Sequence, residues 1–589
     1  MNQSTLLSVN HLKLDFKSDR GNVSGIKDIS FDLRQGETLG IVGESGSGKS
    51  VTALAIMGLL PQTARVSGEI LFNHDDRIID LLKVPLRQMR HYRGDAISMI
   101  FQEPMTSLNP LFTCGYQVIE AILQHQTVTL EQAKAQAIQL FQEVRLPNPA
   151  QMIDRYPHEL SGGQLQRVMI AIAISCNPKI LIADEPTTAL DVTVQASILD
   201  LLRQIQQERQ MSIIFITHDL GVISQIANQV AVMYKGNIVE SGSLEQIFSQ
   251  SQHPYTKGLI ACRPQPELRL KFLPTVSDFM AEDPVTGEII TKQLDGDRSI
   301  QVVSVEQSED RSTSLQAQEP LLVVRDLRVE FPIKGFFGID RRYLVAVNNI
   351  SFDVYPGETL GLVGESGCGK TTAGRAILRL IKASGGSIQF EGKDVISMSS
   401  KQLQRLRREM QIVFQDPYGS LNPRMSVGDS IEEPLEIHRQ DSPIYQSRQN
   451  RRERVAYLLQ RVGLDISAID RYPHEFSGGQ RQRICIARAL ALNPKLIIAD
   501  ESVSALDVSV QAQVLNLLKE LQAEFGLTYI FISHDLSVVK FMSDRIMVMN
   551  KGKIEELNSA EAIYSNPQQE YTRNLIAAIP KVELPNMLK

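Results

Sequence analysis

The chain has 589 residues, enough for two or more domains that each bury a core of their own. Its 61 basic and 67 acidic residues give a formal net charge of −6, so the overall charge gives no reason to expect nucleic acid as a partner. No apolar run approaches the roughly 18 residues needed to span a bilayer, and the first residues do not begin a signal peptide, so we expect any membrane role to act through a partner.

The first predicted elements are strands. Alternating apolar residues at 7–9 and 12–16 predict strands of the kind found at sheet edges, followed by a strand at 29–33 and a turn at 35–37. An aromatic residue in this region either stacks on the adenine of a nucleotide or packs in the core. The sequence leaves both interpretations open for Phe16 and for its counterpart later in the chain, Phe331.

A glycine-rich loop follows the next strand. An apolar run at 39–42 precedes GESGSGKS at 43–50, and a helical pattern comes after it. The glycines let the backbone curl so that N–H groups point at phosphate oxygens, the lysine adds charge for the β- and γ-phosphates, and the last hydroxyl can bind Mg²⁺. The helix adds its positive N-terminal end. The candidate phosphate-binding residues are Gly43, Ser45, Gly46, Gly48, Lys49 and Ser50.

Further site candidates stand at the ends of later elements. Residues 103–160 have a mostly helical pattern, and SGGQ then opens another helix whose start attracts anions. An apolar run of the kind found in buried parallel strands ends in Asp184 and Glu185, and the next such run ends at His218. Because ligands bind beyond the carboxyl ends of such strands, we expect a site at these side chains.

All these motifs return in the second half of the chain. Lys370 follows Lys49 by 321 residues, and Glu501 follows Glu185 by 316. A fixed order of motifs at nearly constant offset indicates a duplicated module. The second phosphate loop supplies the candidates Gly364, Ser366, Gly367, Gly369, Lys370 and Thr371.

The stretch between the repeats has a different composition. It holds 11 acidic and 6 basic residues and several prolines, so we predict an acidic linker, disordered at least near 306–319. A weak strand pair at 289–290 and 301–303 is the alternative for part of it. An extra segment at 334–342 follows in the second repeat. The predicted divisions are a first module at 1–262, the linker at 263–320, and a second module with a C-terminal tail at 321–589.

The order of phosphate loop, glutamine, SGGQ, paired acids and histidine, found twice, resembles the ATP-binding cassette (ABC) ATPases. Closer matches are FQEPMTSLNP (101–110), FQDPYGSLNP (414–423), RYPHELSGGQ (155–164), RYPHEFSGGQ (471–480), HPYTKGL (253–259) and QEYTRNL (569–575). These are similar to the subfamily that energises import of oligopeptides, dipeptides, nickel and related solutes, and the fused pair is most similar to peptide and microcin-type importer ATPases. The resemblance implies an α/β fold with two P-loop NTPase domains, each with a mixed or parallel sheet core, an antiparallel β subdomain and a helical subdomain.

The resemblance also implies roles for the candidate residues in water attack on the γ-phosphate of MgATP. Lys49 and Lys370 bind phosphates. Mg²⁺ is held by Ser50, Thr371, Asp184 and Asp500 and sensed by Gln102 and Gln415. The general bases are Glu185 and Glu501, oriented by His218 and His534. The modules pair head to tail, so that each SGGQ closes over the ATP of the other module; these residues are Ser161, Gly162, Gly163, Gln164, Ser477, Gly478, Gly479 and Gln480.

The implied partners are two membrane-spanning permease subunits and, through them, an extracytoplasmic solute-binding protein, with the chain peripheral on the cytoplasmic face of the inner membrane. The stretches 102–110 and 415–423 are either the docking surface for the permease or simple turns. One alternative is a soluble tandem ATPase that acts on ribosomes or nucleic acid. Another is a protein with one dead site, but both glutamates are present although Ser502 replaces the proline of the first module, Pro186.

The five cysteines predict no metal cluster. They lie far apart without a C-x-x-C pair, and Cys262 stands alone where some members of the subfamily carry a cysteine cluster. We expect buried or incidental thiols in a reducing compartment.

Overall fold

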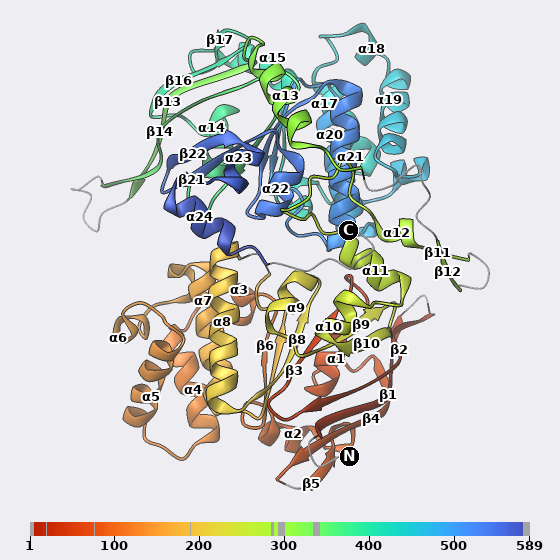
Figure 1. The fold of residues 1–589 in the computed structure, drawn as a ribbon, viewed down its shortest axis with the longest axis vertical. Helices are drawn as coiled ribbons and strands as arrows, with labels where there is room; N and C mark the ends of the chain where they lie inside the picture. The colour runs from red at the N-terminus through yellow and green to blue at the C-terminus, as the bar shows by residue number, and fades with distance from the viewer. Residues whose placement is uncertain are drawn as a thin grey trace.

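The computed structural model shows two α/β modules stacked on each other (Figure 1). It describes residues 5–18, 21–75, 77–188, 190–283, 288–292, 301–333 and 342–580. The tail at 581–589 and all but the last residue of the extra segment at 334–342 lie outside this described part of the chain.

The first module is built on one sheet of ten strands, in the order β5-β4-β1-β2-β10-β9-β3-β8-β7-β6. Strands β6, β7, β8, β3 and β9 are parallel to their neighbours within this group. Every residue of β3, β7 and β8 is buried, which explains their unbroken apolar sequences. The strands are β1 (Thr5–Ser18), β2 (Gly21–Arg34), β3 (Thr38–Val42), β4 (Ala64–His74), β5 (Arg77–Asp80), β6 (Ile97–Ile100), β7 (Ile180–Asp184), β8 (Ser212–Thr217), β9 (Gln229–Tyr234) and β10 (Asn237–Ser243).

The edge position expected for the first strand is wrong. β1 pairs antiparallel with β2 on one side and with β4 on the other. Alternation of apolar and polar residues reports that one face of a strand is exposed, and it does not distinguish an edge from an interior position.

The helices of the first module start at identifiable caps. Thr129 and Ser161 form capping boxes with the glutamines three residues later, and α7 begins at the SGGQ segment as the sequence predicts. The helices are α1 (Lys49–Ile56), α2 (Leu86–Tyr92), α3 (Pro104–Ser107), α4 (Cys114–His125), α5 (Leu130–Glu143), α6 (Pro149–Met152), α7 (Gly162–Ile174), α8 (Val192–Arg209), α9 (Leu220–Ile226), α10 (Leu244–Ser249) and α11 (Pro254–Ala261), with short 3₁₀ helices η1 (Leu81–Lys83) and η2 (Pro157–Glu159).

The second module repeats this plan with its sheet in two parts, a parallel-cored sheet β18-β19-β20-β15-β21-β22 and an antiparallel sheet β14-β13-β16-β17. The two sheets remain linked, because the backbone N–H of Asn348 in the antiparallel sheet donates to Gly552 O, next to the parallel-cored sheet, at 2.8 Å. The strands are β13 (Leu322–Ile333), β14 (Arg342–Val354), β15 (Thr359–Val363), β16 (Gly385–Phe390), β17 (Lys393–Asp394), β18 (Met410–Val413), β19 (Leu496–Asp500), β20 (Thr528–Ile532), β21 (Arg545–Asn550) and β22 (Lys553–Ser559). The helices are α14 (Lys370–Ile377), α15 (Ser400–Glu409), α16 (Pro417–Ser420), α17 (Val427–Ile437), α18 (Pro443–Gln446), α19 (Arg448–Arg461), η4 (Ile466–Asp470), η5 (Pro473–Glu475), α20 (Gly478–Leu490), α21 (Val508–Phe525), α22 (Leu536–Met542), α23 (Ala560–Ser565) and α24 (Glu570–Ala577).

The expected disorder near 306–319 is wrong, because most of this stretch is helix α13 (Val305–Gln316). A capping box at Ser304 starts the helix, and Arg311 anchors it by ion-pairing with Asp544 of the second module at 2.8 Å. Short linker elements precede it, namely α12 (Val276–Phe279), β11 (Met280–Glu282) and β12 (Ile289–Thr291). The expected strand at 289–290 exists within β12, but it pairs with β11 and not with 301–303.

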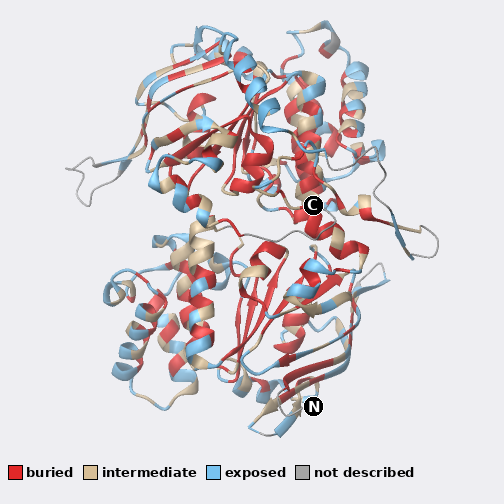
Figure 2. Ribbon diagram, viewed as in Figure 1, coloured by how far each residue is buried: buried red, intermediate tan, exposed pale blue. Residues whose placement is uncertain are grey.

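The buried residues follow the parallel strands and the helices that pack on them in both modules (Figure 2). The hydrophobic core of the second module also includes Leu270 and Leu273, so the start of the linker is packed on the second module. Cys114, Cys262, Cys368 and Cys485 are buried free thiols and Cys176 is half-buried. Burial raises the pKa of each of these thiols.

Candidate nucleotide site

Two copies of the candidate site lie at the carboxyl ends of the parallel strands. In the first copy, Lys49 opens α1 directly after the loop that follows β3. Its Nζ donates to Gly43 O at 2.7 Å and to Glu44 O at 2.9 Å, so the lysine lies folded back across the loop. Burial lowers its pKa. Lys370 makes the same two bonds, to Gly364 O and Glu365 O.

The loop conformation depends on glycine at two kinds of position. Gly48 has a φ of 105°, and a Cβ there would lie 2.8 Å from Gly25 O, so a side chain is excluded by backbone. Gly46 has a φ of 78° with no atom within 4 Å of a Cβ position, so this side of the loop is open. Gly367 and Gly369 repeat the pattern. The loop is thus closed toward the protein and open on one side, as a phosphate cradle must be.

A hydroxyl and a carboxylate meet beside each loop. Ser50 Oγ donates to Asp184 Oδ1 at 3.0 Å, and Thr371 Oγ1 donates to Asp500 Oδ1 at 2.8 Å. Burial raises the pKa of Asp184 to about 6 and also raises that of Asp500, whose Oδ2 is buried without a hydrogen-bond partner. One carboxylate and one hydroxyl are the protein ligands that Mg²⁺ uses when phosphates and water complete its shell. These residues therefore fit Mg²⁺.

Glu185 occupies a constrained position at the end of β7. Its φ of 47° is in the left-handed region, which is uncommon for a glutamate and typical of functional sites. Gln102 Nε2 donates to its Oε2 at 2.8 Å, and His218 Nδ1 lies 3.4 Å from its Oε1. Burial raises the pKa of Glu185, but the hydrogen bond and charge of His218 outweigh burial and lower it to about 2. The same partnership raises the pKa of His218 against its own burial.

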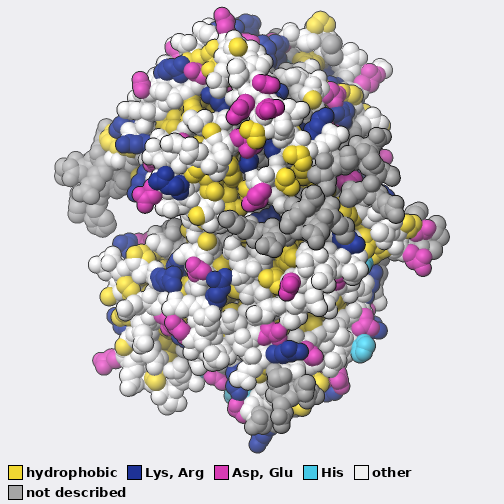
Figure 3. Space-filling model, viewed as in Figure 1, with side chains coloured by type: hydrophobic (Ala, Val, Ile, Leu, Met, Phe, Trp, Pro, Cys, Tyr) yellow, Lys and Arg dark blue, Asp and Glu magenta, His cyan; other side chains and the backbone are white. Residues whose placement is uncertain are grey.

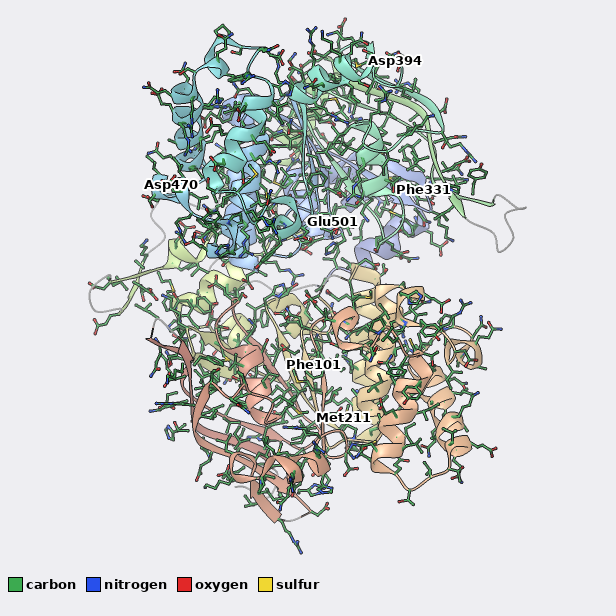
Figure 4. All side chains as sticks on the ribbon, turned by 180° about the vertical axis from the view of Figure 1, so that it is seen from behind. Phe101, Met211, Phe331, Asp394, Asp470 and Glu501 are labelled. Carbon is green, nitrogen blue, oxygen red and sulfur yellow. The ribbon has the colours of Figure 1, made fainter. Side chains whose placement is uncertain are left out.

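The second copy brings together the corresponding residues with one difference. Glu501 has a φ of 46°, accepts from Gln415 Nε2 at 2.8 Å and lies 3.5 Å from His534 Nδ1. In the first copy the hydroxyl of Thr188 also donates to the carboxylate of Glu185, whereas Ser504 donates to the main-chain oxygen of Glu501. Figure 4 shows Glu501 on the side of the second module that faces the first.

The SGGQ residues cap their own helices. Ser161 accepts from the Gln164 N–H at 3.4 Å, while the Gln164 side chain accepts from the Ser161 N–H at 3.0 Å, and Ser477 and Gln480 repeat this exchange. The two glycines between them form the first turn of α7 and α20. Their action on the ATP of the opposite module stays a prediction.

Other residues connect each phosphate loop to the opposite module. The Ser45 N–H donates to Asp507 Oδ1 at 2.9 Å, and the Ser366 N–H donates to Asp191 Oδ2 at 3.3 Å. Glu365 accepts from Thr193 at 2.9 Å, and Ser509 donates in the same way to Glu44. A cavity of about 90 Å³ at this junction is lined by both His218 and His534.

The two candidate aromatic residues differ in their surroundings. Phe16 is half-buried and packs against the core of the antiparallel part of the first sheet. Phe331 is 37% exposed and lies on β13 near the outer edge of the second module (Figure 4). Stacking on adenine stays a prediction for both, and the exposed ring of Phe331 is the more available of the two.

The predicted permease-docking stretches are short helices with exposed apolar side chains. Met105 is 60% exposed in the first stretch and Tyr418 is 64% exposed in the second, and Leu111, just beyond the end of the first stretch, is 80% exposed. Next to Tyr418, a groove of about 510 Å³ is lined in part by Phe414 and Ile437. Elsewhere, on the face shown in Figure 3, basic and acidic side chains are interspersed over both modules.

Sequence reasoning missed three kinds of residue at the site. Asp191 and Asp507 each accept a hydrogen bond from the phosphate loop of the opposite module, and no local sequence pattern indicates such a contact. Arg263 lies 3.2 Å from Asp219, the residue after His218, and Ile579 stands at the corresponding place in the second module. Tyr255 and Tyr571 reach the phosphate loops from the HPYTKGL and QEYTRNL segments, whose repetition was the available signal.

Comparisons with known proteins agree with this geometry. A family model described as "ABC transporter" matches residues 26–188 and 347–504, and a model described as "Oligopeptide/dipeptide transporter, C-terminal region" matches residues 239–281. No helix among the described residues is long and apolar enough to cross a membrane.

Relatives named as import ATP-binding proteins align with 99% of this chain. The chain is 49% identical over 592 residues to the glutathione import ATP-binding protein GsiA of Escherichia coli (strain K12), and the alignment covers 99% of this chain and 91% of the relative. The protein of the same name from Shigella sonnei gives the same identity and coverage. A solved structure of MJ0796, titled a bacterial ABC transporter cassette, is 28% identical over 41% of this chain and 98% of that one, with a TM-score of 0.37.

Proposed function

The chain belongs to the ABC transporter family of ATP-binding proteins, and on this premise we propose that it hydrolyses MgATP at two sites to energise the import of a peptide or peptide-like solute. One observation carries the proposal. In each module the phosphate-loop lysine, a hydroxyl–carboxylate pair and a glutamine–glutamate–histidine cluster converge at the ends of neighbouring parallel strands.

The residues divide the work of water attack on the γ-phosphate. Lys49 leaves its carbonyl partners to bind phosphate oxygens. Ser50 and Asp184 hold Mg²⁺, which neutralises phosphate charge when bound. Glu185 takes the proton of the attacking water, a role worth about 10²–10⁴-fold in rate, and Gln102 and His218 position it. Lys370, Thr371, Asp500, Glu501, Gln415 and His534 do the same in the second module.

Glu185 must lose partners before it can act as a base. In the structure its carboxylate contacts Gln102, Thr188 and His218, and its pKa of about 2 makes it a weak base. A bound γ-phosphate competes for the donors Gln102 and His218 and adds negative charge beside the carboxylate, and both effects raise the pKa of Glu185 toward a useful range. The partners of Glu185 thereby restrain hydrolysis until a γ-phosphate competes for them.

The two modules pair head to tail within one chain, and closure brings each SGGQ over the opposite nucleotide. The reciprocal contacts of Ser45 with Asp507 and of Ser366 with Asp191 support this pairing, because they join each phosphate loop to the opposite module. A nucleotide held between two half-sites favours the closed pair only while its γ-phosphate is present. Hydrolysis therefore reopens the pair.

The relatives' name, a glutathione import ATP-binding protein, supports glutathione or a similar short peptide as the solute. The proposed partners are two membrane-spanning permease subunits, which the chain joins on the cytoplasmic face of the inner membrane, and, through them, an external solute-binding protein. The exposed apolar side chains at 102–110 and 415–423 are the proposed docking surfaces.

Reconstitution tests this function. The chain is combined in liposomes with the permease subunits that co-purify with it and with their binding protein, and uptake of labelled glutathione, dipeptides and oligopeptides is measured with and without ATP. We expect ATP-dependent uptake of one peptide class that is abolished by Glu185→Gln with Glu501→Gln. ATPase activity that co-purifies with ribosomes and never with membrane subunits would contradict the import role.

A further inference from the structure

The segments HPYTKGL and QEYTRNL stand near the ends of the two modules, and the reaction gives them no role. They share a tyrosine, a threonine and a leucine. In the fold they begin α11 and α24, and both helices lie at the boundary between the modules (Figure 1). Each therefore places a tyrosine close to a nucleotide site.

The tyrosine hydroxyls make the same contact in both modules. The backbone N–H of Glu44 donates to Tyr255 Oη at 3.1 Å, and the N–H of Glu365 donates to Tyr571 Oη at 3.1 Å. Glu44 and Glu365 are the second residues of the phosphate loops. The N–H of the next residue, Ser45, is held by Asp507 of the opposite module. Two successive N–H groups at the start of the first phosphate loop therefore donate to different modules, that of Glu44 to its own module and that of Ser45 to the opposite one.

Burial makes this contact consequential. The Tyr255 side chain is 0% exposed, and its ring packs against Tyr234 with centroids 4.4 Å apart. Both hydrogen bonds are partly shielded from water, since Glu44, Glu365 and Tyr571 are half-buried, and a shielded N–H that loses its acceptor costs more free energy than a solvent-exposed one. Without the tyrosine hydroxyl, the peptide plane before Glu44 would turn so that its N–H finds another acceptor. That turn would disturb the neighbouring N–H groups that face a phosphate.

We propose that Tyr255 and Tyr571 are positioning residues that hold the phosphate loops in their nucleotide-binding conformation. The inference rests on the proposed function, since it assigns a part of the same two ATP sites. The family model for the C-terminal region matches only 239–281, yet the corresponding segment of the second module makes an identical bond. The contact therefore belongs to the nucleotide site of each module and is not peculiar to one terminal extension.

Removal of the hydroxyl alone tests the role. Tyr255→Phe and Tyr571→Phe keep the packed ring and delete the acceptor. We expect each variant to raise the KM for ATP and the Kd for ADP roughly five- to tenfold at the affected site, with kcat within about twofold of wild type. Binding of a fluorescent ADP analogue at equilibrium and steady-state ATPase kinetics measure the two quantities.

Two matched tyrosines separate positioning from packing. Tyr234 contacts the ring of Tyr255, but its hydroxyl bonds to Glu282, and the buried Tyr529 of the second module bonds to Leu518 O. Tyr234→Phe and Tyr529→Phe should leave KM and Kd unchanged. Equal changes in these controls, or a lowered melting temperature with unchanged KM and Kd in Tyr255→Phe and Tyr571→Phe, would overturn the inference.

The wild-type protein reports on the proposed function in the same assay. If it neither binds ADP nor hydrolyses ATP, the proposed function fails and the inference falls with it. If it does both and the phenylalanine variants match it, the inference alone fails.

Discussion

Thr188 donates its hydroxyl hydrogen bond to the carboxylate of Glu185 at 2.9 Å, whereas the corresponding Ser504 donates to the main-chain oxygen of Glu501 at 2.9 Å. The two proposed bases are therefore held differently. Among the residues that the structure describes, three side chains contact the Glu185 carboxylate and two contact that of Glu501. This difference makes the two sites distinguishable by mutation.

Thr188→Val removes one donor from the Glu185 carboxylate and preserves the shape of the side chain. We expect the pKa of Glu185 to rise by roughly one unit, since a hydrogen bond to a charged group contributes about 1.5–3 kcal/mol. A stronger base with fewer partners should turn over faster, by about two- to fivefold. ATPase rates in a Glu501→Gln background report on this site.

The matched control is Ser504→Ala in a Glu185→Gln background, where the hydroxyl touches no carboxylate oxygen. Its rate should be unchanged. A lower rate in Thr188→Val would mean that the hydroxyl serves to position Glu185 and not to restrain it.

Loss of a general base should leave nucleotide binding intact. We expect Glu185→Gln and Glu501→Gln each to lose at least half of the ATPase rate, and the double variant to bind ATP without hydrolysing it, because removal of a base costs about 10²–10⁴-fold. Single-turnover assays with filter-bound ATP measure both properties. An unchanged rate in Glu501→Gln would show that the second site is silent, in keeping with Ser502 in place of a proline.

The aspartates that cross between modules should differ in their effect on stability. Asp191 also caps α8 by accepting from the Val194 N–H at 2.9 Å, whereas Asp507 makes no capping bond to α21. Asp191→Ala should therefore cost about 1 kcal/mol more than Asp507→Ala in the free energy of unfolding. Urea unfolding compares them. Asp191→Asn, which retains a capping side chain, should recover most of that difference.

The attachment of the linker should strengthen as pH rises above neutral. Lys519 is half-buried beneath the linker, where its Nζ lies near Leu270 O. Partial burial, together with the charge of Arg269, lowers its pKa from 10.5 to about 7; Arg311 acts in the same direction and Asp544 opposes. Below pH 7 the buried amine is charged and its burial cost is fully present. Between about pH 7 and 10.5 the docked amine is neutral while the free one is protonated, so stability rises through this window.

Melting temperatures between pH 6.5 and 9 test this. The wild type should gain stability relative to Lys519→Met as pH rises, and the exposed lysine variant Lys553→Met should follow the wild type. Parallel pH profiles for wild type and Lys519→Met would contradict the role of this amine.

The local sequence predicted the buried parallel strands and the site residues that follow them. Strands β3, β7 and β8 have unbroken apolar sequences because both of their faces are buried. Lys49, Glu185 and His218 lie beyond the carboxyl ends of these strands, where the sequence led us to expect them, and their roles stay predictions. The duplication supplied a second instance of every motif. The sequence could not show that Glu185 and Glu501 adopt positive φ, since that depends on the turn that packs around them.

Tertiary contacts explain the failures. Helix α13 has a strongly polar sequence that suits disorder, but Arg311 and the buried Leu315 fix it on the second module. Strand β1 alternates as an edge strand does, yet β4 arrives from more than fifty residues later to cover its free side. The bonds of Asp507 and Tyr255 to the first phosphate loop require elements far along the chain, for which no short sequence pattern exists.

The linker does more than connect. Arg269 donates to Ser543 O, and Lys540 donates to Pro266 O. The backbone of Leu273 exchanges two hydrogen bonds with the side-chain amide of Asn516. The start of the linker is therefore attached to helices α21 and α22 of the second module, including the residue that caps the end of α22. When the nucleotide faces separate, this attachment keeps the two halves at a high effective concentration that does not depend on how much protein the cell makes. Reassembly of the pair is then a unimolecular event, and specific activity should be independent of dilution, unlike that of a motor assembled from two separate chains.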